Sequence, residues 1–183
     1  LKKDEKTSHI PIILLTGKTG EMNEIKGLNT GADDYITKPF NPRTLQIKVH
    51  NIIENRNKIH QRYQQDNLFR PKEIAVTSAD EAFLKKVQNV FDQHLVNPEF
   101  HAEIFSKHVA MSRMQLHRKM LAYTGLSTSN FIRSQRLKQA TTILKSSQYT
   151  INEVAYMVGF STPSYFIKCF KETYGKTPLE YIS

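Results

Sequence analysis

The sequence predicts a mainly α-helical protein, with an all-α domain of two helix-turn-helix units joined by a connecting helix. A β-α-β-α fragment of a parallel, doubly wound domain is predicted to precede it. Two observations support this: short apolar strands alternate with helical segments in the first part, and a repeat of about fifty residues fills the last part. We expect the first domain over residues 1–66, a linker over 67–77 and the helical domain over 78–183.

The first part alternates strand and helix signals. The apolar run Ile10-Pro-Ile-Ile-Leu-Leu15 predicts a buried parallel strand, and residues 21–29 predict a helix that Gly31 ends. A second short strand is expected over residues 34–37. Asn41 followed by Pro42 is typical of a helix start, with Asn41 as the N-cap and Pro42 in the first turn.

The helix from Pro42 towards Gln65 carries a stripe whose members are alternately four and three residues apart. The stripe consists of Leu45, Val49, Ile52, Arg56, Ile59 and Tyr63. It would either cover the sheet of its own domain or form a helical linker or short coiled coil with a second copy. An incomplete parallel sheet exposes a strand edge, so this fragment is expected to be disordered or to dimerise along the stripe.

A new helix is expected at Ser78, where Glu81 completes a capping-box pattern. Beyond it, residues 109–112 match residues 158–161, and residues 125–132 match residues 175–182. Each copy predicts a helix, a tight turn and a second helix, with one extra residue just after the second turn. The serine that ends each turn, Ser112 in the first copy and Ser161 in the second, is expected to cap the helix that follows it.

The second helix of each copy should present its outer face, which in a helix-turn-helix enters the major groove of DNA. Arg118 and Lys168 occupy equivalent positions in the repeat and would reach bases or phosphates. A rigid connecting helix over residues 131–144 would hold the two outer faces at a fixed separation. The candidate contact residues are Ser112, Arg113, Met114, Gln115, His117, Arg118, Ser161, Thr162, Ser164, Ile167 and Lys168.

The net charge of +9 suits a polyanionic partner, although a membrane surface or an acidic protein would fit it too. A single cysteine, Cys169, excludes an internal disulfide and a multi-cysteine zinc module, which favours the cytoplasm. We find no catalytic array and no metal-ligand set, so an enzyme is not expected. The alternative is a basic helical module that docks a protein without reading DNA. The absence of an initiator Met suggests a piece of a longer chain.

Two patterns resemble the DNA-binding domain of the AraC/XylS family of transcription activators. The first is Ile132-Arg-x-x-Arg136-Leu-x-x-Ala140 in the predicted connecting helix. The second runs over residues 151–181 and reads Ile-x-Glu-Val-Ala-x-x-Val-Gly-Phe-Ser-x-Pro-Ser-Tyr-Phe-x-Lys-x-Phe-Lys-x-x-x-Gly-x-Thr-Pro-x-Glu-Tyr. The resemblance implies a sequence-specific transcription regulator whose partners are double-stranded DNA and RNA polymerase.

The N-terminal part resembles the second half of a response-regulator receiver domain. Pro11-Ile-Ile-Leu-Leu-Thr16 is similar to its fourth strand, and Gly31-Ala-Asp-Asp-Tyr35-Ile-Thr-Lys38-Pro39 to its fifth. The resemblance implies phospho-signalling roles for Thr16, Tyr35 and Lys38, a cis bond before Pro39, and a histidine kinase domain upstream or in trans. The resemblance also implies that a complete receiver domain binds magnesium. This chain offers no counterpart of the metal-binding acids or the acceptor aspartate, so no cofactor is expected in it.

Overall fold

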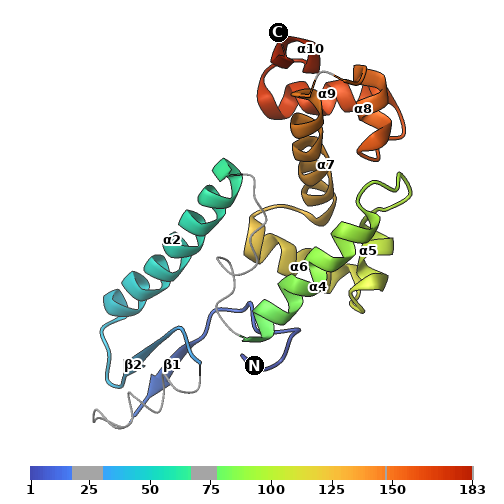
Figure 1. Cartoon of the computed structure of the whole chain (residues 1–183). Helices are drawn as coiled ribbons and strands as arrows, with labels where there is room; N and C mark the ends of the chain where they lie inside the picture. Colours follow the sequence, from blue (N-terminus) through green and yellow to red (C-terminus); the bar gives the residue numbers. More distant parts are fainter. Residues whose placement is uncertain (18–30, 67–77, 147, 183) are drawn as a thin grey trace. The chain divides into compact units, whose positions relative to one another are not determined.

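The computed structural model describes residues 1–17, 31–66, 78–146 and 148–182, apart from the side chains of residues 59–66 and 78 (Figure 1). The described residues are mainly helical, as the sequence predicts. They form two compact units, residues 1–85 with 121–125 and residues 86–120 with 126–183. The elements are β1 (Ile13–Thr16), β2 (Asp34–Thr37), α2 (Pro42–Asp66), α4 (Ser78–His94), α5 (Ala102–His108), α6 (Arg113–Thr124), α7 (Thr128–Leu144), α8 (Ile151–Met157), α9 (Pro163–Tyr174) and α10 (Pro178–Ile182).

Strands β1 and β2 pair in parallel, with Ile13 opposite Asp34. The first strand is shorter than predicted and begins after Pro11, a residue that has no amide hydrogen for a strand ladder. The prediction of a buried strand was wrong at Leu15, whose side chain is 48% exposed, whereas Ile36 in β2 is buried. The helix predicted over residues 21–29 lies outside the described residues.

The connection from β2 to α2 follows the sequence prediction. The peptide bond between Lys38 and Pro39 is cis. The side chain of Asn41 accepts a hydrogen bond from the amide of Arg43 at 2.8 Å, as expected of an N-cap. In the stripe of α2, Leu45 is half-buried and Val49 is exposed. The side chains of Ile59 and Tyr63 lie outside the described part, so both interpretations of the stripe remain predictions.

We call residues 86–120 the first lobe, and the core of this lobe is aromatic. Phe91 on α4 is buried, and its ring makes edge-to-face contacts with Phe100, Phe105 and Phe131 at centroid distances of 5.7, 5.1 and 5.0 Å. Those three rings come from the segment before α5, from α5 and from α7. Phe91 therefore ties together segments that are distant in the sequence.

We call α8, α9 and α10 the second lobe, which packs against the C-terminal half of α7 (Figure 1). Its buried cluster consists of Leu137, Ala140, Leu144, Val154, Ala155, Val158, Phe160, Phe166, Cys169 and Phe170. Cys169 is 1% exposed, so its thiol is part of the core. Both lobes are thus built on α7, as the sequence predicts for the connecting helix.

Side-chain caps fix where the helices of the second lobe begin. Thr150 and Glu153 form a capping box at the start of α8, and Thr177 and Glu180 make the same reciprocal hydrogen bonds at the start of α10. Hydrogen bonds from the Thr150 amide and hydroxyl lower the pKa of Glu153. The carboxylate is therefore the form that caps the helix. No described helix is both long and apolar enough to span a membrane.

Candidate nucleic-acid interface

The sequence repeat is also a repeat of geometry. Helices α5 and α8 have seven residues each, and α6 and α9 have twelve each. The turns carry the same backbone hydrogen bonds, at matching distances of 3.0 to 3.1 Å. These bonds are Val109 N to Phe105 O, Ala110 N to Lys107 O and Met111 N to Ser106 O in the first copy, and Val158 N to Val154 O, Gly159 N to Tyr156 O and Phe160 N to Ala155 O in the second.

Both turns need a left-handed residue at the same repeat position. Ala110 has φ 55° and Gly159 has φ 88°. The left-handed region suits glycine and strains an alanine, because Cβ then approaches the following carbonyl. The first copy therefore keeps the turn even though it has an alanine where the second copy has glycine.

The second helices begin differently in the two copies. Ser112 caps α6, accepting from the amide of Gln115 at 3.2 Å, while the Gln115 side chain accepts from the Ser112 amide at 3.1 Å. In the second copy the N-cap of α9 is Thr162, and its side chain makes no capping hydrogen bond. The extra residue moves the cap from Ser161 to Thr162, and Pro163 presets the backbone of the first turn instead.

The structure exposes most of the residues predicted to contact DNA. The exposed ones are Ser112, Arg113, Met114, His117, Arg118, Ser161, Thr162, Ser164 and Lys168. Gln115 is half-buried because it takes part in the cap. Ile167, which was predicted to lie outside, is half-buried and packs partly against the second-lobe core. It lies three residues before the buried Phe170 and so shares its side of the helix.

Two basic residues, Lys86 and Arg136, donate hydrogen bonds to carbonyl groups at or just after helix ends. Lys86 donates to the carbonyl of Val109, the C-cap of α5, at 2.8 Å. Arg136 donates from Nε to Leu95 O at 2.9 Å, and from Nη2 to Asn97 O and Phe100 O at 2.7 and 3.0 Å. These carbonyls include ones that a helix leaves without partners at its C-terminal end. Burial lowers the pKa of Arg136, yet an arginine stays charged in proteins.

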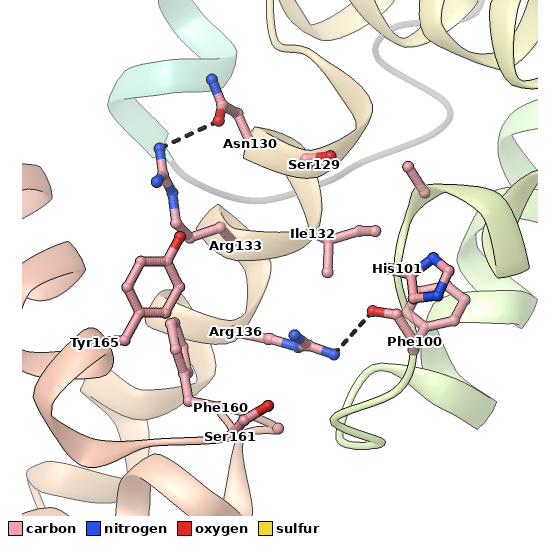
Figure 2. Close-up of a pocket in the computed structure, with 12 residues that line it drawn as sticks. Phe100, His101, Ser129, Asn130, Ile132, Arg133, Arg136, Phe160, Ser161 and Tyr165 are labelled. Atoms are coloured by element: carbon pink, nitrogen blue, oxygen red, sulfur yellow. Dashed lines mark hydrogen bonds between the residues drawn. The ribbon is translucent and has the colours of Figure 1, made fainter.

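Some residues near this surface were not singled out by the sequence. Tyr165 is 51% exposed on α9, and Lys119 on α6 is fully buried. Arg133 donates from Nη2 to the side chain of Asn130 at 3.1 Å (Figure 2). Its Nη1 lies 4.0 Å from the sulfur of Cys169. Helical periodicity places each of them on a face, but it gives no sign of these contacts.

The receiver-like residues lie near the two-stranded sheet. Thr16 and Tyr35 are half-buried and Lys38 is exposed; the Lys38 amide donates to Thr16 O at 2.6 Å. The neighbouring acids pair with lysines at 2.7 Å, Asp33 with Lys2 and Asp34 with Lys48.

Magnesium prefers several oxygen ligands that converge on one point. Here each of the two neighbouring carboxylates is paired with a lysine instead. Within the described ranges, no group of three or more His, Cys, Asp or Glu side chains could hold a metal ion. The described residues of the receiver part therefore do not fit a magnesium site.

Comparison with known proteins agrees with this geometry. The family model described as a helix-turn-helix domain matches residues 105–183, and the response regulator receiver domain model matches residues 1–50. Histidine kinase P4 of Formosa agariphila is 37% identical over 99% of this chain, and PhoB of Pseudomonas aeruginosa is 57% identical over 29% of it. The chain spans 13% of the first relative and 23% of the second.

Solved structures match the helical domain. The DNA-binding domain of AdpA, in complex with a target DNA, is 28% identical with a TM-score of 0.50, covering 54% of this chain and 87% of that one. The C-terminal domain of the response regulator yesN from Fusobacterium nucleatum gives a TM-score of 0.52 at 24% identity, covering 54% and 96%. Residues 105–183 therefore form a helix-turn-helix DNA-binding domain of the AraC type, and part of a response-regulator receiver domain precedes it over residues 1–50.

Proposed function

We propose that this chain binds duplex DNA sequence-specifically, with α6 and α9 entering successive segments of the major groove. The observation that carries the proposal is the repeated turn, which presents a basic second helix twice from one rigid framework. Duplex DNA offers the major groove again after about 10 base pairs, or roughly 34 Å. A single protein surface with two equivalent helices suits that periodicity.

The proposed contacts follow from exposure and charge. Arg118 and Lys168 are exposed at equivalent positions of α6 and α9 and would contact bases or phosphates. Arg113 and His117 on α6, with Ser164 on α9, provide further donors that face solvent. The remaining proposed contacts are Ser112, Met114, Gln115, Ser161 and Thr162. Ile167 is not included, because it packs partly against the core.

We also propose that the DNA-binding domain is the output part of a two-component, or hybrid, phosphorelay in the cytoplasm. The likeness to a histidine kinase over nearly the whole chain supports this proposal. Thr16, Tyr35 and Lys38 would transmit phosphorylation in a complete receiver, supplied with its phosphoryl group by a histidine kinase domain upstream or in trans. The DNA-bound protein would then act on RNA polymerase.

Titration of the full chain against duplexes selected from a random pool tests DNA binding. We expect affinity to fall steeply as salt rises, because Lys and Arg release counterions from the phosphates that they neutralise. If the side chain of Arg118 reads a base, Arg118→Ala should weaken binding by about 1 to 3 kcal/mol. If it contacts a phosphate instead, the slope of log affinity against log salt concentration should become shallower by about 1. Lys85→Ala is the matched control, because Lys85 pairs with Glu81 on α4, outside both turns.

Binding that does not change with salt, or none to any duplex, would contradict the proposal. An equal loss in the Lys85→Ala control would show that net charge, and not α6, carries the affinity. Retention of a protein partner without any duplex binding would favour the alternative of a docking module.

We further propose a homodimer formed by the receiver fragment and α2. Ile47 and Ile53 on α2 are 53% and 51% exposed, and Leu15 at the sheet is 48% exposed. Apolar surface of this kind favours association with a second copy, and an open strand edge is a template for pairing. Light scattering of the full chain should give a mass that rises towards twice the monomer as concentration increases. A strict monomer at high concentration would contradict this proposal.

A further inference from the structure

The two lobes meet at a joint built from one arginine, one glycine and one loop. Arg136 projects from α7 towards the segment that follows α4, where it donates to the carbonyls of Leu95 and Asn97. It also donates to the carbonyl of Phe100 (Figure 2). Gly159, in the turn of the second lobe, lies against the same place. We call Arg136, Gly159 and the loop of residues 95–100 the interlobe joint.

The contact at Gly159 is closer than any side chain allows. A Cβ at this position would lie 2.8 Å from Leu95 O, 2.9 Å from Arg136 Nε and 3.0 Å from Val96 C. The turn of the second lobe therefore rests on the arginine and on the backbone of the first-lobe loop. Even a small rotation of one lobe against the other would change these distances.

Apolar packing does not fill the space beside the joint. A pocket of about 230 Å³ opens there between the lobes and α7 (Figure 2). Phe100 and His101 line it from the first-lobe side, Arg133 from α7, and Phe160 and Tyr165 from the second lobe. Arg136 and Gly159 also line this pocket, so their contacts with the first-lobe loop join the lobes beside the open space.

We infer that Arg136 is a positioning residue that sets the angle between the lobes and thereby the spacing of the two DNA segments that α6 and α9 read. This inference rests on the proposed DNA binding. A planar guanidinium that donates in fixed directions to three carbonyls tolerates little rotation. One base pair inserted between the segments shifts the second by about 3.4 Å and turns it by roughly a tenth of a circle. A rigid joint cannot follow that movement.

The test is a spacing profile. The starting duplex carries the binding site selected from the random pool. One or two base pairs are then inserted or deleted between the segment proposed to bind α6 and the segment proposed to bind α9. The full wild-type chain should bind the parent duplex best and lose about tenfold in affinity per changed base pair, the size of a lost base contact. In Arg136→Ala this discrimination should be lost, while the salt dependence of binding stays. Arg136→Lys should restore part of the discrimination, because its ammonium group can still donate to these carbonyls. The rescue should be incomplete, because one ammonium cannot reproduce the fixed donor directions of the guanidinium.

Gln139→Ala is the matched control, since Gln139 is exposed on the same helix. It should keep the wild-type spacing profile. A folded Arg136→Ala with the wild-type profile would overturn the inference. Absence of any duplex binding by the wild type would instead contradict the proposed function, so the two failures are distinguishable.

A measurement without DNA covers the case in which Arg136→Ala does not fold. Spin labels at Lys107→Cys on α5 and Glu172→Cys on α9, both exposed positions, report the distance between the lobes; the native Cys169 is buried. Arg136→Lys should broaden the distance distribution relative to the wild-type background. An equally narrow distribution, together with an unchanged spacing profile, would also overturn the inference.

Discussion

Gly159→Ala is expected to destabilise the protein by about 3 kcal/mol or more, since backbone strain and overpacking act at the same residue. The residue has φ 88°, and the added Cβ would meet Leu95 O at 2.8 Å. The neighbouring atoms are mostly backbone and cannot move aside as a flexible side chain would. Urea unfolding followed by circular dichroism gives the free energy of unfolding of each variant.

Ala110→Gly is the matched substitution in the first copy of the turn. It relieves the left-handed strain at φ 55° but adds freedom to the unfolded chain, so the net change should stay within about 1 kcal/mol. If Gly159→Ala cost no more than this, the close approach at the interlobe joint would not be a real constraint.

Phe91→Ala is expected to destabilise the helical domain by about 3 to 5 kcal/mol, the range for a large buried aromatic residue. Its ring is buried and contacts Phe100, Phe105 and Phe131 at 5.0 to 5.7 Å, so the substitution opens a cavity shared by several segments. Thermal and urea unfolding measure the loss, and DNA affinity should fall with the folded fraction.

Leu121→Ala provides the comparison for Phe91. Leu121 is a large apolar residue that is 46% exposed on α6, so its replacement should change stability by less than about 0.5 kcal/mol. Similar losses for Phe91→Ala and Leu121→Ala would mean that the aromatic cluster is not the core of the first lobe.

Local signals in the sequence predicted most of the helices. Asn41 with Pro42 marked the start of α2, and the repeat predicted that α6 and α9 are equivalent elements. Such predictions succeed because caps and helical periodicity depend on neighbours within one or two turns. The exposure of Arg118 and Lys168 followed from the same periodicity.

Contacts between distant segments were beyond such reasoning. In the sequence, Arg136 looks like any basic residue on a helix. In the fold, it binds carbonyl groups that follow α4, about forty residues earlier in the chain. Lys86 caps α5 in the same way. Ile167 was expected outside, although the core of the second lobe extends to its side of α9.

The sequence by itself determined that this protein has two helix-turn-helix units on a connecting helix, because local periodicity and internal repetition encode both. Only the tertiary structure decided which basic side chains remain free to meet a phosphate and which cap a helix. Carbonyl groups at a helix end and water molecules can both accept the hydrogen bonds of a guanidinium or an ammonium group. The residue type alone does not tell which of the two acceptors a side chain uses. The choice depends on which loop the fold brings within about 3 Å of the donor.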